Sequence, residues 1–177
     1  MAITAGQLVY LQNVFTGEYL RVTFGLRATV GTRLSLDTIQ NDYSKWRFLP
    51  MSNGASGPYY LQTMQPVTYP NGSLWQMNAD VDHADWQEYT PIVIALGTPS
   101  QVWDALPAGP ANTYYIRSYL GDFMKAAGRN VTFDLFMAAE KETTFDPNVG
   151  KTRWVKTRRK DLVPGDLPYM QWTVTNA

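Results

Sequence analysis

The feature that most constrains the fold is a pattern that recurs three times along the chain. Similar segments begin 50 and 55 residues apart, and they read Val9-Tyr10-Leu11-Gln12, Tyr59-Tyr60-Leu61-Gln62 and Tyr114-Tyr115-Ile116-Arg117. A turn glycine follows each segment, and a tryptophan lies toward the end of each repeat, at Trp46, Trp103 and Trp172. A repeated unit of this size buries its apolar face only against its neighbours. The pattern therefore predicts one domain built from three similar units.

Short strand-like segments, bounded by turn residues, make up each unit. Leu34 and Leu36 alternate with polar residues in the first unit, as do Val131, Phe133 and Leu135 in the third. The stretch with the best helix composition, 136–141, is too short to form a helix alone. The second strands are predicted at Tyr19-Leu20, Leu74-Trp75 and Phe123-Met124, and the third strands at Leu34/Leu36, Ile92/Ile94 and Phe133/Leu135. We expect an all-β barrel or sandwich of three four-stranded units.

The closing tryptophans carry a family resemblance. Gln101-Val102-Trp103 has the form Gln-x-Trp, and the other two units read Ser44-Lys45-Trp46 and Met170-Gln171-Trp172. This pattern resembles the β-trefoil of the ricin-B-like lectin superfamily, over roughly residues 7 to 175. The leader Ala2-Ile3-Thr4-Ala5-Gly6-Gln7 is similar to that of cysteine-free fungal trefoil lectins and of mushroom protease inhibitors with the same fold. The resemblance implies one β-trefoil domain over 1–177, with units at about 7–57, 58–111 and 112–177.

The third unit is longer than the others. Tyr115 precedes Trp172 by 57 residues, whereas the interval is 36 from Tyr10 to Trp46 and 43 from Tyr60 to Trp103. We expect an insertion at about 138–168. Trp154 is an alternative closing residue, but Trp172 is preferred because the chain ends shortly after it, as it would after a final barrel strand. We expect a core built on Trp46, Trp103 and Trp172, with Tyr10, Tyr60 and Tyr115 beside them.

Composition limits the function classes. The chain has no cysteine and a single histidine, and it shows no phosphate-binding loop and no metal-spaced His/Glu pair. We therefore expect a protein that is not an enzyme and needs no metal or cofactor. The formal net charge is zero, and the sequence contains no secretory signal and no long apolar run. A cytoplasmic protein without membrane insertion is expected, and an oligomer remains open.

A mixed acidic and aromatic segment in the second unit is the first candidate binding site. Sugars present apolar faces beside hydroxyl groups, so a receptor needs aromatic rings with hydrogen-bonding groups at their edges. The segment between the second and third strands of unit two contains that mixture, whereas its counterpart at 23–32 has no acid. The same acids faintly suggest calcium, but the glycine and terminal glutamate of an EF-hand loop are missing. The predicted sugar-binding residues are Trp75, Asn78, Asp80, Asp82, His83 and Trp86.

The resemblance also implies a departure from the usual sugar sites. Galactose-binding members carry an aspartate directly after the Gly-x-x-Leu of each second strand, and the corresponding positions here are Arg21, Trp75 and Lys125. None of these accepts a sugar hydroxyl as a carboxylate does. We therefore expect few and non-standard sites.

A basic run in the third unit allows other functions. Six of the fifteen basic residues fall between Lys151 and Lys160, interleaved with Trp154. Stacking of that ring on a base would suit single-stranded nucleic acid, but a solvated hairpin explains the charges equally, so nucleic-acid binding is disfavoured. Arg158, Arg159 and Lys160 form an alternative, protease-facing loop. The preferred function is a lectin, in fungal defence, with glycans or glycoproteins as partners; the alternative is a protease inhibitor.

Overall fold

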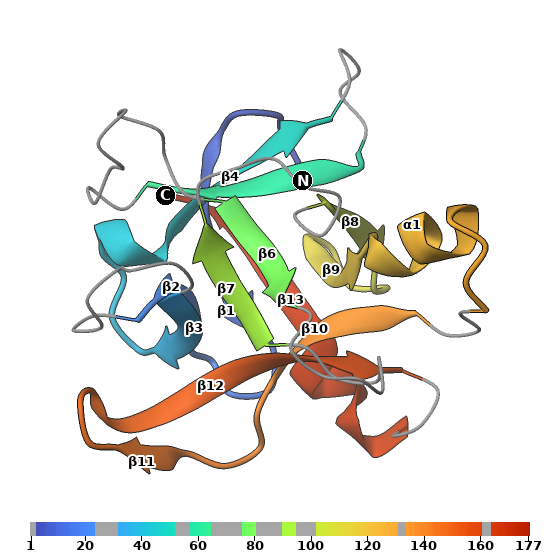
Figure 1. Ribbon diagram of the computed structural model, residues 1–177. Coiled ribbons are helices and arrows are strands. Elements are labelled where there is room, and N and C mark those ends of the chain that lie inside the picture. The colour runs from blue at the N-terminus through green and yellow to red at the C-terminus, as the bar shows by residue number, and fades with distance from the viewer. Residues whose placement is uncertain are drawn as a thin grey trace.

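The computed structural model describes residues 3–23, 32–51, 57–64, 76–80, 90–94, 102–130, 134–160 and 164–177. Six of its strands form a closed antiparallel ring (Figure 1). In ring order they are β1 (Leu8–Asn13), β4 (Lys45–Pro50), β5 (Tyr59–Thr63), β8 (Val102–Pro107), β9 (Thr113–Ser118) and β13 (Gln171–Asn176). Because β13 pairs with β1, the last strand closes the barrel against the first. Full closure leaves the barrel without exposed sheet edges.

Each unit adds a hairpin to this ring. The hairpins pair β2 (Tyr19–Val22) with β3 (Thr32–Asp37), β6 (Gln76–Asp80) with β7 (Thr90–Ile94), and β10 (Leu135–Ala139) with β12 (Gly150–Arg159). β3 also pairs with β7 and with β12, so the three hairpins meet one another. A six-stranded barrel with three hairpins is a β-trefoil, as the sequence predicts.

The three closing tryptophans occupy equivalent positions. Each is fully buried, and each indole Nε1–H donates to a backbone carbonyl in the second strand of its own unit. All three bonds measure 3.0 Å, from Trp46 to Leu20, from Trp103 to Met77 and from Trp172 to Met137. A buried indole N–H needs such a partner. The prediction that Trp172 closes the third unit is therefore confirmed.

The first strands are also aligned as predicted, but their tyrosines do not all enter the core. The closing tryptophans pair with Val9, Tyr59 and Tyr114 on these strands, which is the alignment of the sequence repeat. Because side chains alternate across a strand, Val9 and Leu11 point inward and Tyr10 between them is half-buried. Tyr60 is half-buried for the same reason, whereas Tyr115 is buried in a smaller cluster with Phe136. The prediction of core positions for Tyr10 and Tyr60 is wrong.

The third unit carries its additional residues in two places rather than in one block. The predicted second strand at Phe123-Met124 lies in a helix, α1 (Leu120–Ala126), and Leu135 begins the second strand, β10. Ser118 Oγ accepts from the amide of Leu120 at 3.3 Å as the helix begins, and Gly128 follows its end at φ 78°. The third strand is β12, so residues 150–159 belong to the trefoil itself and not to the predicted insertion.

A second added element extends the hairpin of unit three. β11 (Thr144–Asp146) pairs with the first residues of β12 and projects from the barrel in Figure 1. It lengthens the path from the second strand to the closing tryptophan, which spans 35 residues in unit three and 26 in the other two. Short 3-10 helices, η1 (Asp42–Ser44) and η3 (Pro164–Met170), precede β4 and β13.

Candidate functional site

Two of the six predicted sugar-binding residues lie in a described strand. Asn78 and Asp80 belong to β6, where their backbones pair with Ile92 and Thr90 of β7. The other four, Trp75, Asp82, His83 and Trp86, lie outside the described residues. The site in unit two stays a prediction.

The basic run of unit three lies in a strand, not in a loop. Arg158 and Arg159 pair with Phe136 and Leu135 of β10, and both belong to β12. Lys160 directly follows the strand, and its Nζ lies 3.9 Å from the centre of the Tyr115 ring. The prediction of a protease-facing loop at Arg158, Arg159 and Lys160 is therefore wrong for its first two residues, because their backbones are held in the sheet.

Two of the charges on this strand are matched by carboxylates of other segments. Arg153 Nε donates to Glu18 Oε2 at 2.6 Å, and Lys156 Nζ lies 3.0 Å from Glu140 Oε1. Trp154 has only 5% of its surface exposed, and the Arg33 guanidinium lies 4.1 Å from the centre of its ring. Trp154 is therefore not available to stack on a base, and nucleic-acid binding loses the ring on which it depended.

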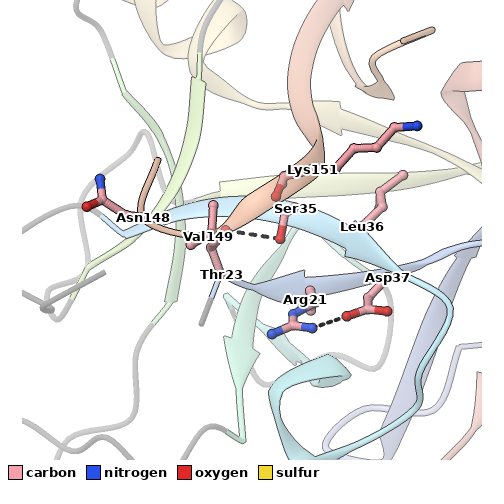
Figure 2. Close-up of a pocket in the computed structure, with 9 residues that line it drawn as sticks. Arg21, Thr23, Ser35, Leu36, Asp37, Asn148, Val149 and Lys151 are labelled. Carbon is pink, nitrogen blue, oxygen red and sulfur yellow. Dashed lines mark hydrogen bonds and ion pairs between the residues drawn. The ribbon is translucent and has the colours of Figure 1, made fainter. Parts of the chain in front are cut away.

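A polar pocket lies where the hairpin of unit one meets the added hairpin of unit three. Its volume is about 430 Å³, which is within the range of about 300–1,000 Å³ found for small-molecule sites. Figure 2 shows residues of β2 and β3 on one side and residues from the turn into β12 on the other. The pocket is lined by Arg21, Thr23, Ser35, Leu36, Asp37, Asn148, Val149, Lys151 and Thr152.

An ion pair forms one wall of the pocket. Arg21 Nη1 contacts Asp37 Oδ2, and the two side chains point toward each other in Figure 2. Asp37 Oδ1 also accepts from the amide of Ile39 at 3.2 Å, so both carboxylate oxygens are engaged. Arg21 Nε donates weakly to Val22 O at 3.4 Å, and within the described part of the chain its Nη2 has no partner. The wall therefore offers a ligand a donor, and each oxygen of its carboxylate already accepts one hydrogen bond.

The two hydroxyl groups of the pocket are occupied by each other. Thr23 Oγ1 donates to Arg33 O at 2.6 Å, and it shares a hydrogen bond of 3.0 Å with Ser35 Oγ. Both residues are buried. They therefore fix the spacing of β2 and β3 rather than presenting hydroxyls to a ligand.

The opposite rim comes from the turn between β11 and β12. Among the described contacts, the side chain of Asn148 forms no hydrogen bond. Its backbone amide donates to Asp146 Oδ1 at 2.8 Å. Gly150, at φ 82°, lets the chain reverse there. The next residue, Lys151, is exposed and forms no ion pair within the described residues. The rim thus adds an amide to the pocket, whereas the Lys151 amine points away from Arg21 and Asp37 in Figure 2.

Sequence reasoning missed this pocket but contained one signal of it. Arg21 was identified as the position where the resembled family carries an aspartate, and the structure places it in the pocket wall. The partner carboxylate, Asp37, is the last residue of β3. Asn148 and Lys151 lie more than a hundred residues further along the chain, and no local pattern connects them with Arg21.

A second charged cluster has a structural function. Arg117 of β9 contacts Asp104 of β8, and it lies 2.8 Å from Asp122 of α1 and 3.3 Å from Asp134. Burial lowers the pKa of Arg117, but the hydrogen bond and charge of Asp104, with the charges of the other two carboxylates, outweigh it and raise the pKa. The guanidinium connects α1 and the start of β10 to the barrel. Among the described residues, no group of three acidic or histidine side chains has the arrangement of a metal site.

Comparison with known proteins supports the fold. No family model and no curated protein matches the sequence significantly. A designed threefold-symmetric protein, ThreeFoil, superposes with a TM-score of 0.62 at 14% identity, covering 96% of this chain and 99% of its own. The SDF2-like protein of Arabidopsis thaliana gives 0.66 at 10% identity, covering 99% and 95%. No helix in the described part of the chain is long and apolar enough to cross a membrane.

A third structural neighbour is a neurotoxin whose description names a ligand. It is botulinum neurotoxin type C, whose cell entry is described as dependent on interaction with two ganglioside molecules. The TM-score is 0.62 at 7% identity, and the match covers 99% of this chain and 44% of the toxin chain. At such identities the likeness shows the architecture alone. Together with the closed barrel and the three equivalent tryptophans, these comparisons show that the chain has the β-trefoil fold.

Proposed function

We propose that this protein is a carbohydrate-binding β-trefoil that recognises glycans or glycoproteins and catalyses no reaction. The observation that carries the proposal is the pocket of about 430 Å³ between β2–β3 and the β11–β12 turn. Its lining leaves Arg21 Nη2 and the Asn148 side-chain amide, within the described contacts, to form hydrogen bonds with a polyhydroxylated ligand. A ganglioside is a glycolipid, so the toxin comparison adds coarse support for a glycan partner. A cytoplasmic location remains part of the proposal.

The pocket and the predicted site in unit two make separable contributions. The structure provides a cavity for the first, whereas the aromatic and acidic residues at 75–86 support the second through their composition. A protein with both would have one or few non-standard sites, because the position of the usual aspartate is Arg21 in unit one.

The test is a glycan array followed by titration of each hit. We expect binding that is reduced either by Arg21→Met/Asp37→Leu, for the pocket, or by Trp86→Ala and Asp82→Ala, for unit two. The double substitution removes the ion pair as a unit, so that no partly buried charge is left without its partner. An array without signal, together with stoichiometric inhibition of trypsin or a papain-type protease, would replace this proposal with the inhibitor function.

A further inference from the structure

An exposed aromatic surface lies at the turn between β1 and β2, outside the pocket. Phe15 is 58% exposed and its neighbour Val14 is 45% exposed. The Phe15 ring stacks on the ring of Tyr169 in η3, with the ring centres 4.1 Å apart and the planes inclined by 32°. None of these three residues lines the pocket. We call Val14, Phe15 and Tyr169 the aromatic platform.

Phe15 presents one face of its ring to solvent. The other face rests on Tyr169, yet more than half of the surface of Phe15 remains exposed. Tyr169 is half-buried, and Lys141 Nζ lies 5.8 Å from the centre of its ring. A ligand that stacks on the platform therefore meets the outer face of Phe15, with Tyr169 behind it.

A buried asparagine fixes the platform. Asn13 has no exposed surface, and its Nδ2 donates to Tyr169 O at 2.8 Å and to Gln171 O at 3.4 Å. Its Oδ1 accepts from the amides of Phe15 at 3.2 Å and Thr16 at 3.1 Å. One side chain thus connects the backbones that carry the two rings. Because the rings are held in place before a ligand arrives, binding loses little conformational entropy.

The backbone of the turn disfavours a protease as the partner. Gly17 N donates to Asn13 O at 2.9 Å, and Asn13 N donates to Glu18 O at 2.9 Å, so residues 13–18 form a tight turn. A cleft that binds a peptide through its main chain needs an extended segment. The turn offers an aromatic ring face instead of an extended backbone.

The charges around the platform are balanced. Arg153 Nε donates to Glu18 Oε2 at 2.6 Å, at the end of the turn. Lys141, beside the Tyr169 ring, is followed directly by the exposed Glu142. Two cations thus accompany two carboxylates. A nucleic acid needs surplus positive charge to hold its phosphates, whereas a neutral ligand does not.

We propose that the aromatic platform binds a neutral pyranose unit of a glycan, with the C–H face of the sugar stacked on Phe15. The inference rests on the proposed function and deepens it, because it adds a stacking subsite outside the pocket and names neutral sugars as its ligands. A single ring face contacts one side of a sugar and does not require the end of a chain. Single sugars should therefore bind with a Kd of about 1 mM or weaker, and chains more tightly, because each unit can occupy the platform in turn.

The experiment is saturation-transfer NMR and titration of the full chain with methyl β-glucoside, methyl β-galactoside and cellotetraose. We expect the strongest transfer at the axial C–H protons of the bound ring, with upfield shifts from the current of the Phe15 ring. Hydrogen bonding in a polar pocket would not select these protons. The affinity should not change between about 0.05 and about 0.5 M NaCl, because salt screens only charged contacts.

Matched phenylalanine variants localise the effect. Phe15→Ala should weaken binding of cellotetraose about threefold to tenfold, and Phe15→Tyr should keep the affinity within about twofold because it keeps the ring. Phe145→Ala is the control. Phe145 of β11 is 78% exposed, but among the described residues it stacks on no other ring. Its loss should leave the affinity unchanged, and circular dichroism establishes that all three variants fold.

The outcomes separate this inference from the proposed function. If Phe15→Ala binds as tightly as the unchanged protein, or if Phe145→Ala loses as much affinity, the platform is not a sugar subsite, and hits on the glycan array still support the carbohydrate function. If an oligo(dT) strand binds through Phe15 and cellotetraose does not, the ring stacks on bases and the inference fails. If none of the three sugars gives transfer at about 10 mM, the inference also fails, whereas the carbohydrate function fails only when the array is without signal as well.

Discussion

Replacing Trp172 by phenylalanine tests the structural equivalence of the three units. Trp172 is fully buried, and its Nε1–H donates to Met137 O at 3.0 Å across the inside of unit three. Phenylalanine keeps an aromatic ring but removes this donor and part of the ring volume. The lost hydrogen bond costs about 1–3 kcal/mol when the carbonyl is left without the donor. The smaller ring adds roughly 1–2 kcal/mol, below the cost of a full truncation.

We therefore expect Trp172→Phe to reduce the free energy of unfolding by about 2–5 kcal/mol. For a domain of this size that corresponds to a fall in Tm of roughly 2–4 °C for each kcal/mol. The measurement is urea unfolding followed by far-ultraviolet circular dichroism, which does not depend on the fluorescence of the removed residue. An unchanged m value would assign the shift in midpoint to stability.

Trp154→Phe is the matched control. Trp154 is almost as buried, but within the described residues its indole N–H has no hydrogen-bond partner. We expect it to lose about 1–2 kcal/mol, from packing and from the Arg33 contact. Trp46→Phe and Trp103→Phe should match Trp172→Phe within about 1 kcal/mol, because they lose the same bond. If Trp154→Phe costs as much as Trp172→Phe, the reasoning from the shared hydrogen bond is refuted.

Three further predictions concern the added elements and one turn. Arg117→Met should destabilise the fold by about 1–3 kcal/mol in thermal unfolding, because Asp104, Asp122 and Asp134 lose their shared cation. If the double variant Arg117→Met/Asp104→Leu recovered full stability, a network of three carboxylates would be contradicted. Replacing residues 142–148 by two glycines should abolish binding to the pocket while the near-ultraviolet signal of the buried tryptophans persists; retained affinity would show that the added hairpin forms no part of the site. Gly17→Ala should cost about 1 kcal/mol in urea unfolding, because Gly17 has φ 69° with nothing within 4 Å of an added Cβ, so the cost is conformational and a neutral result would contradict it.

The barrel was predictable from the sequence because its signals are local and repeated. The closing tryptophans and the first strands recur with nearly constant neighbours, and the structure aligns them as the repeat does. The burial of individual side chains was harder to predict. Tyr10 and Tyr60 look like core residues by composition, but the alternation of the strand assigns the inward positions to their neighbours.

The third unit was misread because its strands depend on distant partners. β12 carries a run of charges that is atypical of a buried strand, yet four of its residues, Thr152, Trp154, Val155 and Thr157, are buried. Its outward charges are matched by residues such as Glu18, which lies 135 residues from Arg153. An ion pair between residues so far apart in the sequence cannot be recognised from the pattern of neighbouring residues. The predicted second strand at Phe123-Met124 was wrong because these residues lie in a helix of seven residues. A helix this short spans only about two turns, which are too few to show a helical pattern in the sequence.

The same long-range construction decides where binding is expected. In a symmetric trefoil each unit builds its own site from its own hairpin. A comparison of the unit sequences then favours the unit with the most suitable ligand-binding residues. Here the added hairpin of unit three reaches the hairpin of unit one, and the pocket draws on both. Arg21, at the position of the usual aspartate, therefore lines a pocket that two units build together. Where the resembled family carries a carboxylate, which accepts hydrogen bonds, the pocket wall here presents Arg21, which only donates them.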